Sequence, residues 1–221
     1  SGATIVTDNL VLRHQYVLNP VQPLSDGAAY FAGSTEHIQL VSAISNNVFS
    51  FSAWINVTED ATTKTILDTR DGTNDGVVFF INSAERLALS INNSDSIIGS
   101  AANLTAGIWQ HVVATYNGTN LKLYIDGVLV ETTADAGSSE TVAVTTAARI
   151  GKFAYTNASW FNGYMANVGV WSAALNQEQI KSIMWKKYSD LTSSETTSLV
   201  SWWNLSVDAN DNHGSNHGTL S

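Results

Sequence analysis

The stretch WQHVVATYNGTNLKLYIDGVLVE, residues 109–131, decides the fold class of this 221-residue chain. It holds three short runs rich in apolar, aromatic and β-branched residues, a composition typical of strands. Asn117-Gly118 and Asp126-Gly127 separate the runs, and such pairs supply the positive φ angles that tight hairpin turns need. The stretch therefore predicts an antiparallel meander of three strands.

Further strands are predicted on both sides of this meander. Residues 49–57 alternate between apolar and mostly polar side chains, and a period of two indicates a strand with one buried face. Residues 77–81 and 87–91 form another pair of strands, and 149–151 and 163–171 add two more. Short strands separated by turn signals predict an all-β chain folded as a two-sheet antiparallel sandwich.

One short helix is predicted within residues 176–188. Asn176 is a suitable N-cap and Gln179 stands three residues later, as in a capping box. Ile180 and Ile183 follow at helical spacing. We expect this helix to cover one end of the sandwich.

The two ends of the chain have different predicted roles. Residues 1–25 are interpreted as an arm or edge strand, and residues 26–221 as one domain. Residues 199–205 are apolar on both faces of a strand and contain Trp202 and Trp203, which would be costly to expose. We expect this strand to close the domain beside residues 163–171, followed by a polar loop over 206–221.

The composition restricts the partners. Apolar residues make up 44% of the chain, enough for a large core, which excludes a disordered chain. The net charge of −9 disfavours nucleic acid and anionic membranes, whereas an excess of carboxylates suits divalent cations. The absence of Cys favours a bacterial or viral source, because secreted eukaryotic domains of this size usually carry disulfides.

Five segments in series resemble the laminin-G-like, pentraxin-like group of the concanavalin-A superfamily: residues 31–38, 49–55, 109–118, 123–127 and 163–180. The resemblance spans about residues 28–182 and implies a two-sheet jelly roll of the lectin kind. It extends to tandem modules of bacterial surface proteins and of marine-phage virion proteins. Residues 199–218 are similar to the segment that usually opens such domains. Here that segment closes the chain, either in permuted order, which we favour, or as the start of a following repeat.

No catalytic residues are predicted. Glycosidases of this superfamily carry carboxylates at alternate positions of one strand, and the chain has no such spacing. His213 and His217 lie beside Asp211, but the intervening glycines make a helix unlikely, so a polar loop is expected rather than a zinc site. His111 alternates with Trp109 in a strand and is interpreted as a structural histidine.

The resemblance implies a structural Ca²⁺ ion where the terminal strands meet. Its ligands would be Asp211, a carbonyl near Gly33, and Asn167, where relatives often carry Asp. The ligand calcium of pentraxins is not expected, because residues 151–155 contain no carboxylate.

Two loops are the predicted ligand site. Residues 69–75 contribute Asp71, Asn74 and Asp75; residues 155–161 contribute Tyr155, Asn157 and Trp160. Sugar recognition combines a flat ring for the C–H face of a pyranose with fixed polar groups for its hydroxyls. The alternative is that Trp160 and Phe161 only cover the edge of the sandwich.

These observations predict a non-catalytic recognition module that binds carbohydrate or a glycoconjugate. It would belong to a secreted, cell-surface or virion protein such as a phage tail or fibre component. A structural spacer or oligomerisation domain without a ligand is the second reading. A glycan-cleaving enzyme with an unrecognised site is the third.

Overall fold

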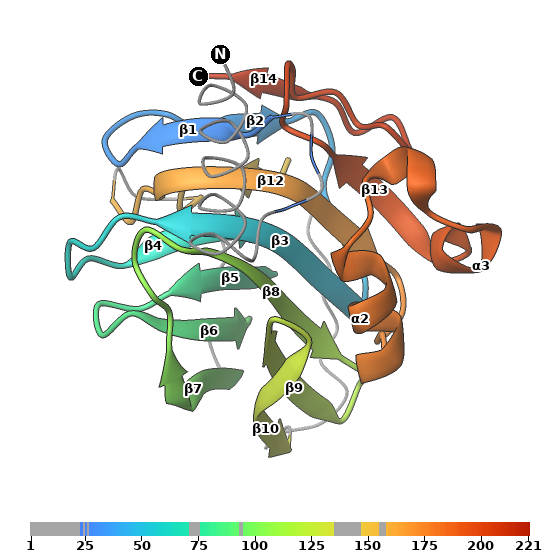
Figure 1. Cartoon of the computed structure of the whole chain (residues 1–221), viewed down its shortest axis with the longest axis horizontal. Helices are drawn as coiled ribbons and strands as arrows, with labels where there is room; N and C mark the ends of the chain where they lie inside the picture. The colour runs from blue at the N-terminus through green and yellow to red at the C-terminus, as the bar shows by residue number, and fades with distance from the viewer. Residues whose placement is uncertain are drawn as a thin grey trace, which may run out of the picture.

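The computed structural model describes Pro23, Ser25 and residues 27–70, 76–92, 95–134, 147–154 and 158–221, with the backbone alone for 95–103 and 134. Two seven-stranded antiparallel sheets pack face to face (Figure 1). The predicted all-β jelly roll is therefore confirmed. Among the described residues, no helix is long and apolar enough to cross a membrane.

The first sheet has the order β1 (Ala29–Ala32), β12 (Asn162–Trp171), β3 (Phe49–Val57), β8 (Trp109–Tyr116), β9 (Asn120–Ile125) and β10 (Val128–Ala134), with β13 (Leu199–Trp203) also paired to β12. The second has the order β14 (Gly218–Leu220), β2 (Ile38–Leu40), β11 (Arg149–Ile150), β4 (Lys64–Asp68), β5 (Val77–Ile81), β6 (Arg86–Ile91) and β7 (Asp95–Asn103). β1 and β13 share one edge of β12: β1 pairs with residues 162–165 and β13 with residues 168–171.

The meander β8–β9–β10 forms as predicted. Gly118 has φ 86°, and Asp126 and Gly127 have φ 50° and 72°, the left-handed values that the two turns require. Asn117 Oδ1 also accepts hydrogen bonds from the amides of Thr119 (3.0 Å) and Asn120 (2.7 Å). The local sequence therefore determines both turns.

The main core lies between the two sheets. The apolar side chains of β3 from Phe49 to Val57 point into it, as the period of two predicts, and meet those of β5, β6 and β8. The opposite side of β3 is also buried, because Trp54 is only 1% exposed. This outer face of the first sheet therefore needs a cover.

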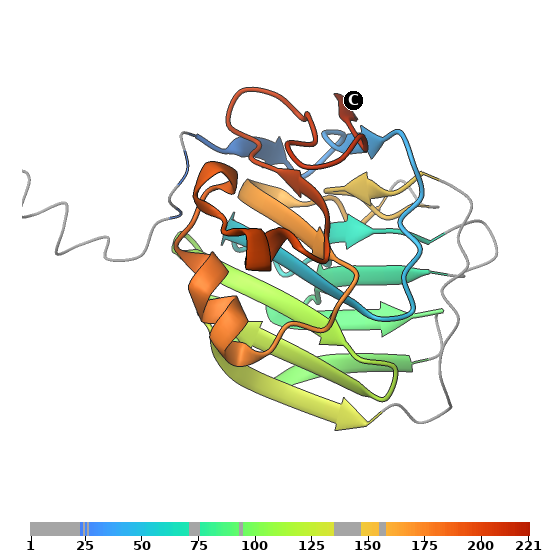
Figure 2. The ribbon, with the colours of Figure 1, turned by 90° about the vertical axis from the view of Figure 1, so that its right-hand side faces the viewer.

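The cover is α2 (Gln177–Met184), which lies against the outer face of the first sheet rather than at the end of the sandwich (Figure 2). Its capping box forms as predicted, with both Asn176–Gln179 hydrogen bonds at 2.9 Å. Ile180 and Ile183 pack with Trp171 and other residues of that face, and the indole N–H of Trp54 donates to the Met184 carbonyl at 2.8 Å. The expected position was wrong because the first sheet is apolar on both faces.

Two short helices after α2 were not predicted: η1 (Tyr188–Asp190) and α3 (Ser193–Thr196). α3 begins with a second capping box, in which Glu195 Oε2 accepts from the Thr192 amide at 2.7 Å. The Glu195 carbonyl accepts from the Trp171 indole at 2.9 Å, so α3 also closes over the outer face.

β13 takes the predicted place, antiparallel to β12, with Trp203 opposite Val168 and Trp202 opposite Gly169. Trp203 enters the main core, and Trp202 packs edge-on against Trp171 on the outer face, with ring centroids 5.9 Å apart. A Cβ at Gly169 would stand 2.6 Å from the Trp171 ring, so glycine is needed for this approach.

The expectation of a loop through the end of the chain was wrong at residues 218–220. These residues form β14, which pairs with β2, and the Ser221 amide continues the ladder to the His37 carbonyl at 3.0 Å. Main-chain hydrogen bonds hold this strand, and its side chains are largely exposed. The apolar pattern therefore could not reveal it.

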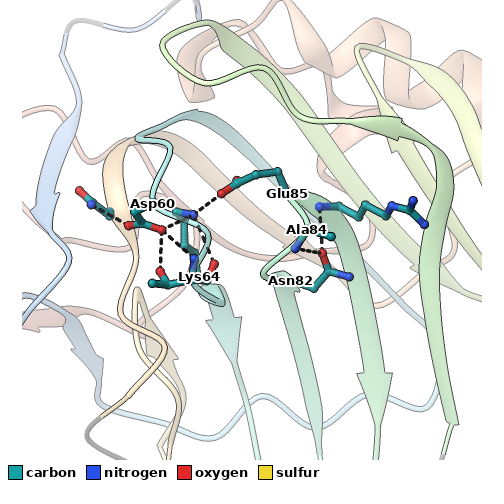
Figure 3. A network of polar contacts seen from close by, with 8 residues as sticks. Asp60, Lys64, Asn82, Ala84 and Glu85 are labelled. Atoms are coloured by element: carbon teal, nitrogen blue, oxygen red, sulfur yellow. Dashed lines mark hydrogen bonds and ion pairs between the residues drawn. The ribbon is translucent and has the colours of Figure 1, made fainter.

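A buried lysine joins two loops at one end of the second sheet (Figure 3). Lys64 Nζ lies 2.7 Å from Asp60 Oδ1 and 2.8 Å from Glu85 Oε1, and its side chain is fully buried. Asp60 also accepts from Asn162 Nδ2 at 2.8 Å. Burial acts to raise the pKa of Asp60, but the hydrogen bonds from Lys64 and its neighbours outweigh this and hold the pKa far below its usual range.

Candidate ligand-binding surface

Five of the six residues predicted to bind a ligand, Asp71, Asn74, Asp75, Tyr155 and Asn157, lie outside the described residues. Trp160 is described, as are the residues from which both loops start. These residues show how the two predicted loops are related.

Asp68 joins the starting points of the two loops. Its fully buried carboxylate forms an ion pair with Arg70 at 2.6 Å, and the same oxygen accepts from the Ala154 amide at 2.9 Å. The Arg70 guanidinium lies 4.8 Å from the centre of the Phe153 ring, a cation–π distance. Segments that are far apart in sequence, 68–70 and 153–154, therefore leave the second sheet side by side.

Trp160 is partly exposed and lies among basic side chains. Lys152 Nζ is 4.4 Å from the centre of the indole, and the His37 ring centroid is 5.7 Å away. Burial lowers the pKa of His37, and the nearby Lys152 and Arg149 cations lower it further. This local positive charge contrasts with the net charge of −9 of the whole chain.

Phe161 has a structural role, as in the alternative in which the aromatic residues of this loop only cover the sandwich. It is fully buried in the main core and meets Phe31 edge-on, with ring centroids 5.7 Å apart. The two adjacent aromatics therefore face different surroundings, and only Trp160 is available to a ligand.

The residues of the predicted calcium site come from three parts of the chain: Gly33 follows β1, Asn167 lies within β12 and Asp211 follows β13. Asp211 Oδ1 accepts from the amides of Trp202 (3.0 Å), His213 (3.0 Å) and Gly214 (2.9 Å), and Oδ2 accepts from Asn216 (3.0 Å). Burial acts to raise the pKa of Asp211, but these hydrogen bonds outweigh it and the pKa is lowered. The carboxylate thus holds the backbone of its own loop in place through these four hydrogen bonds.

Gly33 lies beyond one end of β12, whereas Asn167 lies in the middle of that strand. Gly33 follows the pair Ala32–Asn162, and Asn167 stands five residues further along, about 16 Å at a rise of about 3.3 Å per residue. One Ca²⁺ ion needs its oxygens within about 2.6 Å, so Gly33 and Asn167 themselves do not share one ion, and a Ca²⁺ ion bound by Asp211 stays a prediction. Among the described residues, His, Asp and Glu form no cluster of three or more that could hold a metal.

The other histidines that the structure describes, His111, His213 and His217, each have a hydrogen-bond partner within the protein. His217 Nδ1 accepts from the Asp211 amide at 3.1 Å, whereas His213 Nδ1 is paired with the Tyr188 hydroxyl at 3.2 Å. His111 Nε2 is 2.8 Å from Ser52 Oγ, and complete burial lowers the pKa of His111 to about 3. A histidine that remains neutral in the core is unsuited to acid–base catalysis at neutral pH.

A cleft of about 300 Å³ lies elsewhere, where the outer face of β8–β10 meets the segment leading into α2. Asn120, Lys122 and Tyr124, at alternate positions of β9, form one wall, and Leu175 and Gln177 form part of the other. The sequence analysis missed this site. Polar residues at alternate positions of a strand were the available signal, but their opposing wall comes from a distant segment.

Two face-to-face antiparallel sheets with a helix on one outer face define a lectin-like jelly roll. The laminin-G-type model described as the concanavalin A-like lectin/glucanases superfamily matches residues 32–181. The chain belongs to this superfamily. A search of curated protein sequences finds no significant match.

Solved structures share the fold at low identity. A SAP-like pentraxin from Limulus polyphemus has a TM-score of 0.60 at 16% identity, covering 70% of this chain and 80% of its own. A candidate carbohydrate-binding protein from Bacteroides ovatus has a TM-score of 0.67 at 20% identity, covering 90% of this chain but 59% of its own. The sialidase module CBM40 of Ruminococcus gnavus, bound to α2,3-sialyllactose, has a TM-score of 0.57 at 14% identity, covering 72% of this chain and 99% of its own.

Proposed function

We propose that this chain is a non-catalytic carbohydrate-binding module, part of a secreted, cell-surface or virion protein such as a phage tail component. The observation that carries the proposal is the partly exposed Trp160, held between Lys152 and His37. Two neighbours of the same fold support it: the Ruminococcus gnavus module bound to sialyllactose and the candidate carbohydrate-binding protein of Bacteroides ovatus.

The chemistry of this surface suits a sugar. An indole offers a flat apolar face to the C–H groups of a pyranose, and adjacent cationic and imidazole groups donate hydrogen bonds to hydroxyls. Asp68 ties the two loop bases to the rigid second sheet, and such anchoring lowers the entropic cost of binding. The loops 69–75 and 155–161 remain the proposed contacts around Trp160.

Three of the described carboxylates lack the raised pKa of a catalytic acid, whereas burial raises the pKa of Asp126, which accepts a hydrogen bond from the His111 amide at 2.8 Å. Glycosidases need a pair of carboxyl groups, one of them a proton donor with a raised pKa. Asp60, Glu195 and Asp211 are instead held as anions by hydrogen bonds that lower the pKa of each. These three carboxylates are structural.

The proposal is tested with a glycan array followed by calorimetry on the best ligand. Trp160→Ala should weaken binding by about 1–3 kcal/mol with little change in melting temperature, because stacking is lost but little core is. The matched control is Trp185→Ala, because Trp185 is also exposed (47%) but lies beside Trp54, on the face that α2 covers. It should leave binding unchanged.

Two outcomes would contradict this assignment. A chain that binds no glycan on the array supports the structural spacer. Equal losses of binding and stability in Trp160→Ala would show that the indole only covers the sandwich edge.

A further inference from the structure

The cleft on the outer face of the first sheet is a preformed cavity. One wall is the outer face of β9 and the other is the segment 174–177 that leads into α2. Gln177 Nε2 donates to the Gly127 carbonyl at 2.8 Å, and this bond ties the start of α2 to the β9–β10 turn. The capping box fixes the same end of the helix. The walls are therefore held in place without a ligand.

The Tyr124 hydroxyl is a hydrogen-bonding group of this cleft that a ligand could use. The residue is 3% exposed and lines the cleft, its hydroxyl forms no hydrogen bond to any described residue, and this oxygen is not among the buried polar atoms that lack a partner, so it is open to the cleft. Buried aromatic residues with a polar atom usually find such a partner. Each of the four fully buried Trp side chains does so, by donating its indole N–H. The phenol of Tyr124 therefore presents an unused donor and acceptor to the cleft.

Lys122 supplies a positive charge beside this phenol. It stands two residues before Tyr124 on the same face of β9, so their Cα atoms are about 7 Å apart. Lys122 is partly buried and has no ion pair with any described residue. An anion bound here would meet a cation that is already partly desolvated, which strengthens the attraction.

The rest of the lining limits the ligand to a small hydroxylated molecule. Asn120 and Gln177 bring side-chain amides, whereas Leu129 and Leu175 bring apolar surface for C–H groups. A volume of about 300 Å³ holds one sugar ring, at the lower end of the usual size of ligand pockets. The wall chemistry thus combines one cation, a phenol, amides and an apolar patch.

We propose that this cleft is a second binding site, separate from the Trp160 surface, for a sugar acid. The carboxylate pairs with Lys122, a ring hydroxyl bonds to the Tyr124 hydroxyl, and the C–H face of the ring rests on Leu129 and Leu175. The same chemistry serves a free uronic acid or a uronic acid at the end of a glycan.

The test is a ¹⁵N NMR titration at constant ionic strength with D-glucuronate, D-glucose and the disaccharide cellobiouronic acid. Glucose is the matched neutral sugar, because it differs only in carrying a hydroxymethyl group in place of the carboxylate. We expect D-glucuronate to shift amides of residues 115–129 and 174–177 with a millimolar Kd, and glucose to shift them at least about fivefold more weakly. Binding of cellobiouronic acid at equal or higher affinity assigns the site to a glycan terminus, and binding of the monosaccharide alone assigns it to the free acid.

Variants separate the two sites. Lys122→Gln should weaken D-glucuronate binding by about fivefold or more, and Tyr124→Phe by about threefold or more with an unchanged melting temperature, since the hydroxyl bonds to no described residue. Lys152→Gln and Trp160→Ala should leave this binding unchanged. The proposal is overturned if D-glucuronate up to about 20 mM shifts none of these amides, if glucose binds equally well, or if Lys122→Gln binds normally. None of these results bears on glycan binding at Trp160.

Discussion

His111 illustrates how burial alone can set the chemistry of one side chain. It lies in the first sheet beside Trp54, with ring centroids 5.4 Å apart, and its contact with Ser52 satisfies one ring nitrogen. Burial lowers the pKa of His111 from 6.5 to about 3, so the imidazole remains neutral in the folded protein. The unfolded chain therefore takes up a proton at this residue at a higher pH than the folded chain.

This difference predicts an acid-sensitive stability. Because the pKa is depressed by folding, the contribution of His111 is fully present above about pH 6.5 and is lost progressively as pH falls toward 3. Urea unfolding at pH 7 and pH 5 should show a lower free energy of unfolding at pH 5. In His111→Gln that decrease should be smaller. His37→Gln is the control, because the pKa of His37 is lowered in the same direction but the residue is near the surface. An unchanged pH slope in His111→Gln would contradict the assignment.

Asp211 shows how a carboxylate can be used to build a loop. It accepts hydrogen bonds from four backbone amides, so Asp211→Asn should cost about 2–3 kcal/mol of unfolding free energy, measured in urea. Asp208→Asn is the matched control on an exposed residue and should cost little. A chelator such as EDTA should leave the melting temperature unchanged. A Ca²⁺-dependent rise in melting temperature that disappears in Asp211→Asn would show instead that the carboxylate binds the ion.

Among the elements, β13 contributes to two cores at once. Trp203 fills the main core, whereas Trp202 packs under the α2 cover. β1, the first strand among the described residues, occupies the other half of the same edge of β12, and β13 completes that edge. Such a strand fits the permuted order that the sequence suggested.

Truncation tests the contribution of this element. A chain ending at residue 197 loses β13 and β14 and should lose several kcal/mol of stability, because two buried Trp side chains leave with it. The control ends at residue 217 and loses only β14, whose side chains are mostly exposed, so its loss should be much smaller. Equal melting temperatures of the full chain and the 197-residue chain would assign β13 to a missing neighbour.

At the scale of the whole molecule, the two faces of the first sheet pack against different parts of the chain. One faces the main core, and the other is covered in part by α2, η1 and α3 and is open at the cleft over β8–β10. The Trp160 surface lies on the second sheet, where β11 and the loop that follows it meet β2. The molecule therefore offers two separate polar surfaces on one rigid sandwich.

The whole domain is expected to release no sugar from common polysaccharides. A glycosidase needs one carboxyl group that donates a proton. The pKa values of Asp60 and Glu195 are lowered, so both carboxylates are ionised at neutral pH and cannot fill this role. A reducing-sugar assay on bacterial and marine polysaccharides checks this. Activity that disappears with a single Asp or Glu substitution would contradict it.

The sequence by itself determined the features that depend on neighbouring residues. Asn117-Gly118 and Asp126-Gly127 specified the meander, because positive φ is a local requirement. The alternation in residues 49–57 specified which side chains face the core, and the two-sided apolar strand at 199–203 specified that it must be buried. Trp160 could also be predicted from its neighbours in sequence, because it is an aromatic residue among polar ones.

Tertiary structure alone decided which distant segments meet. β14 is held by main-chain hydrogen bonds that any sequence can make, so its side chains gave no sign of the partner β2. The cleft exists only because α2 crosses the outer face of the first sheet beside Tyr124. The path of the surrounding backbone, and not the residue type, brings four amides to the Asp211 carboxylate. Side-chain periodicity specifies a face, but which partner that face meets depends on the packing of the whole chain.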